Sequence, residues 1–375
     1  MTRMLKILKK PVTCMLIAIF CGFVVSALIL FATGYNPTQS LAIMFNAVFS
    51  RPKFITNVII KSTPIILTGL SVAFAFRTGL FNIGAEGQYI AATIASTVVG
   101  ISLDLHPILQ IPIVILSGVL VGALWGAFIG FLKAKFGIHE VITSIMLNWT
   151  TLYLNNYVAN SARFHKPESD GTYPINDSGL TMILYNWKFS EEGRSFLKNN
   201  QTLNDILLKT DLNIGFIVAI IAAIIVWVLL YKTSKGYELR TVGLNPHAAK
   251  YAGISVNRSI VFSMLIAGAL SGLAGALYVT GSSSHNIHVL SMFENNGFNG
   301  LAVALIASSS PIGCIFAGLM FSGLIYAGQS LQFKTGAPSE IVNIMIGTIV
   351  FFVALTQIIP VIADKFTRRR SEHVK

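Results

Sequence analysis

Residues 12–33 read VTCMLIAIFCGFVVSALILFAT, an unbroken apolar run without a charged side chain. At about 1.5 Å per residue, a helix of this length can cross a hydrocarbon core of roughly 30 Å. A basic segment precedes the run, but the run is longer than the apolar core of a secretion signal and lacks a small-residue cleavage site near its end. We therefore expect an uncleaved first membrane helix.

The composition of the whole chain extends this interpretation. Of the 375 residues, 54% are hydrophobic and only 11% are charged, whereas about a quarter of the residues in a soluble domain are charged. Further apolar runs predict spans at about 55–76, 80–102, 108–132, 138–158, 214–231, 258–280, 298–310, 312–330 and 339–362. We therefore predict an all-α, polytopic membrane protein with about ten transmembrane helices, some of them discontinuous, in a single domain over residues 1–375.

The net charge of +12 raises nucleic-acid binding as an alternative. Threading ten spans with the N-terminus inside places most of the 27 Lys and Arg residues in inner loops and in the two tails. Such a bias sets membrane orientation, whereas a nucleic-acid-binding protein collects basic residues on one surface. We expect no nucleic-acid partner, both termini in the cytoplasm, and the long polar segment 159–213 outside the cell.

The cytoplasmic loop 232–257 contains GLNPHAAKYAGI at residues 243–254. Asn245 suits an N-cap, Pro246 suits the first helical position, and Gly253 suits a helix stop. The short helix would expose Ala248 and Ala249, and a face of small side chains invites close contact with a partner. An ordinary surface loop between two spans is the alternative.

Glycine recurs every fourth residue within the span at 108–132. The positions are Gly118, Gly122, Gly126 and Gly130, and Gly268 and Gly272 repeat the spacing once. Small residues on one helical face allow two backbones to approach closely in lipid. We predict that these positions pack helices together.

The stretch FNIGAEGQY at residues 81–89 places polar side chains between two apolar runs. Asn82 is predicted to cap a helix that begins near Gly84, with Glu86 in its first turn, where the helix dipole favours a carboxylate. A helix broken at membrane depth requires burial in protein or a wet cavity, and such breaks mark the substrate sites of many transporters. A cytoplasmic turn anchored by Arg77 is the alternative.

Residues 298–300, Phe-Asn-Gly, open another short apolar run in partial echo of Phe81 and Asn82. The predicted threading runs these two spans in opposite directions, as inverted repeats would run. The remaining ionisable residues within or near spans have simpler interpretations. Lys61 can extend its amine outward from its span, and we place Glu294 and Glu340 at the outer ends of spans.

Signatures of catalysis are missing from the sequence. GIHEVIT at residues 137–143 begins like a zinc-protease motif, but Thr143 stands where the second histidine is required. The seven histidines do not cluster, and no phosphate-binding loop of the G-x-x-x-x-G-K-[ST] type occurs. We expect no metal site and no ATPase activity in this chain, so that any pumping would draw its energy from another subunit.

Four stretches together resemble a known family. FNIGAEGQYIAA, HEVITSIMLNW, GLNPHAAKYAGI and GFNGLAVALIASSSPIG follow one another as in permease subunits of bacterial ABC importers for nucleosides, and the resemblance extends from about residue 53 to residue 360. That family belongs to a larger set that includes simple-sugar and branched-chain amino-acid permeases. The chain departs from the family pattern at His139, where Asn is more frequent, and at Asn299, where Asp is more frequent.

The resemblance implies two groups of functional residues. Residues expected near the substrate pathway, with Phe81 as aromatic surface, are Phe81, Asn82, Glu86, Gln88, Glu140, Asn148 and Asn299. Residues expected in a coupling helix that docks in a groove of the ATPase are Asn245, Pro246, Ala248, Ala249 and Gly253. The loss of a carboxylate at position 299 would alter the polarity of the pathway.

The resemblance also implies the partners. We expect a permease in the bacterial cell membrane that pairs with a second, similar permease, with two ATPase subunits that bind ATP and Mg, and with an extracellular lipid-anchored protein that delivers nucleoside. No cofactor is expected in this chain. Two alternatives stay open: an ABC permease for simple sugars or branched-chain amino acids, and an ion-driven secondary carrier with Glu86 as its coupling carboxylate. A third alternative, an intramembrane enzyme, would need clustered acids or histidines, and the sequence shows none.

Overall fold

The computed structural model describes residues 11–281 and 284–355, and the regular elements within these ranges are all helices. Isolated β-bridges occur, but the described residues form no strand. The all-α prediction is confirmed. The chain forms two compact units: Arg51–Ser322, called here the main unit, and a unit made of the segments up to Ser50 and from Gly323.

The smaller unit contains α2 (Pro11–Ala32), α3 (Pro37–Phe49), α17 (Ser339–Ala354) and the second half of α16 (Pro311–Thr335). α2 packs on α17, where Ser26 Oγ donates to the carbonyl of Met345 at 3.3 Å. The first predicted span therefore corresponds to α2, whereas α3, capped by Asn36, was not predicted. The predicted cytoplasmic termini and the end of the last predicted span lie outside the described residues.

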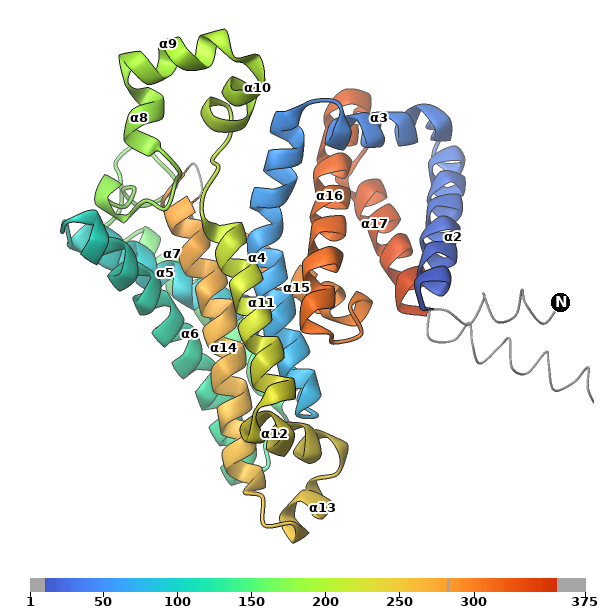
Figure 1. Ribbon diagram of the computed structural model, residues 1–375, viewed down its shortest axis with the longest axis vertical. Helices are drawn as coiled ribbons and strands as arrows, with labels where there is room; N and C mark the ends of the chain where they lie inside the picture. The colour runs from blue at the N-terminus through green and yellow to red at the C-terminus, as the bar shows by residue number, and fades with distance from the viewer. Residues whose placement is uncertain (1–10, 282–283, 356–375) are drawn as a thin grey trace, which may run out of the picture. The chain divides into compact units, whose positions relative to one another are not determined.

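The main unit begins with α4 (Pro52–Arg77), α5 (Ala85–Ser102), α6 (Pro107–Phe136) and α7 (Glu140–Ala159). It continues with α11 (Gly215–Lys232), α14 (Val256–Gly281), α15 (Asn296–Ile306) and the first half of α16. One end of the unit carries residues 160–214, called here the cap segment, with η1 (Asp177–Gly179), α8 (Tyr185–Phe189), α9 (Glu191–Asn199), α10 (Gln201–Leu203) and η2 (Asn204–Leu208). Figure 1 shows α12 (Ser234–Leu244) and α13 (Pro246–Tyr251) at the opposite end of this unit.

Within residues 11–281 and 284–355, five helices are long and apolar enough to cross a membrane: α4, α6, α11, α14 and α16. Such a set is typical of a multi-pass membrane protein. α15 has only 11 residues, about 16 Å of helix, which is half of a hydrocarbon core.

The regularly spaced glycines of α6 pack against α14. A Cβ atom at Gly122 would lie 2.5 Å from the carbonyl oxygen of Gly268, and one at Gly126 would lie 2.2 Å from the carbonyl oxygen of Met264. Both distances are too short for a real side chain, so the two backbones touch where glycine allows them to. The predicted role of these glycines in helix packing is confirmed.

Residues 78–84 leave the end of α4 and turn back along it without forming a helix. Asn82 Nδ2 reaches Ser71 Oγ on α4 at 3.0 Å, and α5 begins three residues later. α5 then runs toward the cap segment, where Asn176 Nδ2 donates to the carbonyl of Leu103 at 2.8 Å. This path is a short non-helical segment, with a turn at each end, followed by a helix.

Residues 284–295 form a second non-helical segment that also leads into a helix, but it approaches from the cap segment, at the opposite end of the unit. They do not form a helix, and they come down from the cap segment along α7, where Asn155 Nδ2 donates to the carbonyl of His288 at 2.7 Å. α15 begins opposite Thr68, whose hydroxyl donates to the carbonyl of Asn296 at 2.9 Å, and it ends near Arg77, whose Nε donates to the carbonyl of Ser309 at 3.1 Å. α5 and α15 therefore start at one level of the unit and run to opposite ends.

Candidate functional site

The side chain of Glu86 joins the beginnings of α5 and α15. It is fully buried in the first turn of α5, as predicted. Its Oε1 accepts from the backbone nitrogen of Asn295 at 2.8 Å, and its Oε2 accepts from that of Gly297 at 2.5 Å. Because the first N–H groups of a helix lack intrahelical partners and carry partial positive charge, a carboxylate between two helix starts stabilises both.

The level of this contact follows from α4. Thr68 meets the first residue of α15 and lies nine positions before Arg77 in a helix of 26 residues. At about 1.5 Å per residue, this is within roughly 5 Å of the midpoint of α4. The Glu86 carboxylate therefore lies near the level of the midpoint of α4.

Asn82 and Gln88 form a reciprocal amide pair beneath this contact. Asn82 Nδ2 donates to Gln88 Oε1 at 2.9 Å, and Gln88 Nε2 donates to Asn82 Oδ1 at 3.1 Å. Both side chains are fully buried. The prediction that Asn82 caps α5 is wrong: the N-cap residue is Gly84, which has no side chain to cap the helix, and the Asn82 amide is bonded to Gln88 and Ser71 instead.

Asn148 of α7 hydrogen-bonds both to the non-helical residues 78–84 and to α5. Its Oδ1 accepts from the backbone nitrogen of Gly87 at 2.9 Å, and its Nδ2 donates to the carbonyl of Ile83 at 3.2 Å. A Cβ atom at Gly87 would lie 2.6 Å from Asn148 Oδ1, so glycine is needed for this close approach. The Asn148 side chain thus bonds one backbone group before the start of α5 and one within its first turn.

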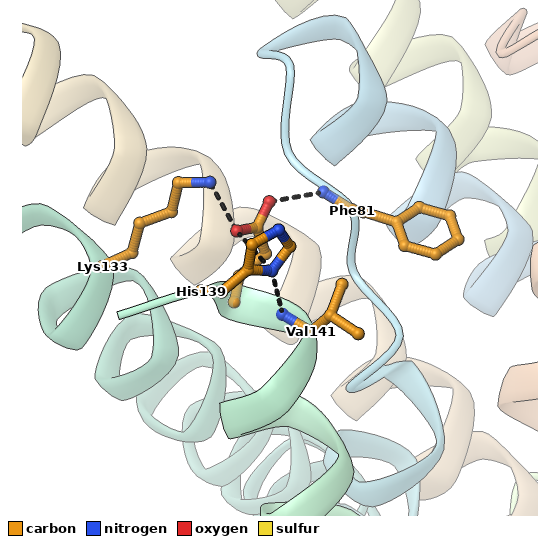
Figure 2. A network of polar contacts seen from close by, with 5 residues as sticks. Phe81, Lys133, His139 and Val141 are labelled. Carbon is orange, nitrogen blue, oxygen red and sulfur yellow. Dashed lines mark hydrogen bonds and ion pairs between the residues drawn. The ribbon is translucent and has the colours of Figure 1, made fainter. Parts of the chain in front are cut away.

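A second polar cluster surrounds Glu140 at the start of α7. Figure 2 shows Lys133, His139 and the backbone nitrogen of Phe81 converging there: Lys133 Nζ lies 2.5 Å from Glu140 Oε2, and the Phe81 nitrogen donates to Oε1 at 3.3 Å. His139 Nδ1 accepts from the nitrogen of Val141 at 3.3 Å and so caps α7. This ion pair fixes the beginning of residues 81–84 against α6 and α7.

Burial separates the predicted pathway residues into two groups. Asn82, Glu86, Gln88, Glu140 and Asn148 are all buried and bonded to atoms of this chain, whereas Phe81 and Asn299 are half-buried. The similar Phe-Asn pairs at residues 81–82 and 298–299 do not occupy equivalent positions in the two half-crossings. Phe81 and Asn82 precede their helix, but Phe298 and Asn299 lie inside the first turn of α15.

Sequence reasoning missed a row of ring contacts on the surface beside this core. Trp149 of α7 lies 6.1 Å from Tyr153 and 4.9 Å from Phe293 between ring centroids, and Phe293 lies 5.7 Å from Phe298. We call these four residues the aromatic row. Trp149 is 46% exposed, Tyr153 is 65% exposed, and the neighbouring Glu294 is also exposed. Glu294 was predicted at the outer end of a span; it lies just before α15, which begins opposite Thr68 near the midpoint of α4 rather than at the end of that helix.

The short helix at the other end of the unit has the predicted bounds. Asn245 Oδ1 accepts from the nitrogens of His247 and Ala248 at 3.0 and 3.1 Å, which makes Asn245 the N-cap of α13. Gly253 follows the helix with a φ of +79°, and the Ile254 nitrogen donates to a carbonyl three positions from the helix end, as in a left-handed glycine stop.

The predicted exposed alanine face is only half correct. Ala248 is exposed, but Ala249 is fully buried because it lies on the side of α13 that packs on its own chain. The most exposed large side chains here are Tyr251 at 95% and Leu244 at 88%.

Residues 54–354 match the family described as the branched-chain amino acid transport system permease component. The chain belongs to this family of membrane permeases, in which a separate subunit hydrolyses ATP, and the family resemblance is confirmed.

Relatives match almost end to end. The chain is 36% identical to the guanosine ABC transporter permease protein NupP of Bacillus subtilis, over 94% of this chain and 96% of that protein. It is 38% identical to the nucleoside ABC transporter permease protein NupB of Lactococcus lactis, over 93% and 92%. It is 27% identical to the glucose ABC transporter permease protein TsgB13 of Haloferax volcanii, over 91% and 86%.

Proposed function

We propose that this chain is one permease subunit of an ATP-driven importer that moves nucleosides into the cell. The observation that carries the proposal is the full-length similarity, at 36% and 38% identity, to permeases named for guanosine and for nucleosides. The permease named for glucose is less similar at 27%. Nucleosides are therefore favoured over simple sugars.

The proposal includes ten membrane crossings in one permease domain, residues 1–375. Eight crossings are α2, α4, α6, α7, α11, α14, α16 and α17. The other two crossings, residues 78–102 and 284–306, are interrupted: each consists of a non-helical segment followed by a helix. In this proposal both termini and α12–α13 lie in the cytoplasm and residues 159–213 lie outside the cell, which the basic residues of the inner loops support.

In this proposal α13 is the coupling helix. α13 follows α12, and Gly243 lies near the end of α12. Gly243 touches the start of the non-helical residues 78–84, since a Cβ atom at Gly243 would lie 2.4 Å from the carbonyl oxygen of Arg77 and 2.9 Å from the nitrogen of Gly79. Thr78 is also held to α14 through Ser263, with 2.9 Å between the hydroxyl oxygens. A shift of α13 caused by closure of the ATPases would reach residues 78–84, and through them Glu86.

The buried polar residues have a defined part in this mechanism. The Glu86 contact holds the two half-crossings together, and the Asn82–Gln88 pair fixes the first of them internally and to Ser71 of α4. A second, similar permease completes the passage, two ATPase subunits bind ATP and Mg, and an extracellular lipid-anchored protein delivers the substrate. This chain needs no cofactor of its own.

The test is uptake by the complete transporter in vesicles containing ATP. We expect uptake of labelled guanosine that stops when the ATPase subunits carry a hydrolysis-blocking substitution. Uptake of ribose or leucine without guanosine would replace the nucleoside proposal with one of its near alternatives. Guanosine uptake driven by an ion gradient in the absence of ATPase subunits would contradict the ATP-driven mechanism.

A further inference from the structure

We propose that the aromatic row, Tyr153, Trp149, Phe293 and Phe298, together with the carboxylate of Glu294, is the surface that contacts the nucleoside during passage. The inference rests on the proposed function and adds the contact residues to it. It assigns the substrate to side chains on the surface of the subunit, next to the buried polar core.

The row lies at the level where the two half-crossings meet. Trp149 is the tenth residue of the 20-residue helix α7, and its neighbour Asn148 is bonded to Ile83 and Gly87 at the break. Phe298 lies in the first turn of α15, beside Gly297, which binds Glu86. Tryptophan that anchors a helix to lipid headgroups is found near the two membrane interfaces. An exposed Trp149 in the middle of the helix does not fit that role.

Glu294 makes a lipid-facing position of this surface costly. Its side chain is exposed, with Oε2 accepting from Asn296 Nδ2 at 3.3 Å. A charged residue facing lipid at this depth costs about 2.5–3.5 kcal/mol on insertion scales, so such residues face protein or water. The outer face of α11 shows the contrast: apart from Trp227 near its C-terminal end, its exposed large side chains are aliphatic, among them Ile217, Ile221 and Ile225.

The chemistry of the row matches a nucleoside. A nucleobase is a flat ring that stacks on aromatic side chains, and such stacking tolerates different bases. The hydroxyl groups of ribose need polar partners, which Glu294 and the half-buried Asn299 can supply beside the rings. A row of linked rings, with Trp149 between Tyr153 and Phe293, offers successive stacking positions along the passage.

The first test measures guanosine uptake by the complete transporter at concentrations below saturation. Trp149→Leu should lower uptake about tenfold, since loss of one stacking platform costs roughly 1–3 kcal/mol, and Trp149→Phe should retain most of it. Trp227→Leu is the matched control, because Trp227 is 37% exposed on α11, away from the aromatic row, with its ring beside Tyr231 and Lys232. Normal uptake by Trp149→Leu in a competent transporter overturns the inference. A wild-type transporter that imports no nucleoside overturns the proposed function instead.

The second test does not depend on transport rates. In a background with the three native cysteines replaced by serine, Tyr153→Cys should react with a charged, water-soluble thiol reagent, and guanosine should slow the reaction. Ile225→Cys, which is 59% exposed on the aliphatic face, should stay unreactive. Protection by guanosine supports the inference, whereas an unreactive Tyr153→Cys places the row against lipid and overturns it.

Discussion

Replacement of Glu86 by glutamine tests the contact between the two half-crossings. The carboxylate accepts one hydrogen bond on each oxygen, from Asn295 and from Gly297. Glutamine keeps one oxygen, so one backbone N–H would face an NH₂ group inside a fully buried site. Loss of a hydrogen bond to a charged group costs about 1.5–3 kcal/mol, and an unsatisfied buried donor costs about 1–3 kcal/mol. Because both costs concern the same backbone N–H, they overlap rather than add, and we expect a loss of about 2–4 kcal/mol.

The assay is the midpoint of thermal unfolding of the purified transporter, measured together with guanosine uptake. For a chain of 375 residues the expected loss corresponds to a midpoint lower by roughly 3–5 °C, and uptake should fall because α15 is no longer fixed to α5. Glu340→Gln is the matched control, since Glu340 is exposed in the first turn of α17. Its expected effect is within about 0.5 kcal/mol. An unchanged midpoint and unchanged uptake in Glu86→Gln would refute this account of the contact.

Three further substitutions have distinct expected outcomes. Gly126→Leu should destabilise the protein by about 3 kcal/mol, because its Cβ atom would lie 2.2 Å from a backbone oxygen of α14. Gly347→Leu is the control and should be tolerated, because a Cβ atom at Gly347 meets no atom within 4 Å. Size-exclusion profiles separate the two outcomes. Asn148→Ala removes both of its buried hydrogen bonds and should lower the thermal midpoint by the equivalent of about 1–3 kcal/mol. Ala248→Glu should leave the subunit folded but weaken ATPase association in pull-down assays, whereas Ala249→Glu, at a buried position, should impair folding itself.

Local patterns predicted the parts of the fold that local chemistry decides. The fourfold spacing of glycines in α6 predicted a close helix contact, because lipid provides no other reason to repeat small residues on one face. Asn245 and Gly253 predicted the two ends of α13 through capping preferences that act within a few residues. Glu86 was predicted in the first turn of α5 by the same kind of argument.

Tertiary contacts decided what the sequence left open. Glu86 binds the nitrogen of Asn295 across 209 residues of sequence, and no local pattern reports that distance. Asn82 carries a side chain suited to capping, but Gln88 and Ser71 compete for the same amide, and the buried pair prevails. The burial of Ala249 depends on which side of a six-residue helix meets the rest of the chain.

The aromatic row explains the largest omission. A tryptophan in an apolar helix is ordinarily a core or lipid-facing residue, and nothing beside Trp149 in the sequence contradicts that interpretation. Its partner ring belongs to Phe293, in a segment that reaches α7 only after α14 has crossed the unit. The exposed carboxylate of Glu294 beside these rings becomes informative only once both segments are placed.

An electron cryo-microscopy map of the assembled transporter in a lipid nanodisc tests the junction of the half-crossings most directly. It should show residues 78–84 and 284–295 as non-helical chain, and the Glu86 carboxylate near mid-bilayer within 3.2 Å of the nitrogens of Asn295 and Gly297. A continuous helix through residues 78–102, or a Glu86 carboxylate in the headgroup layer, would contradict the account.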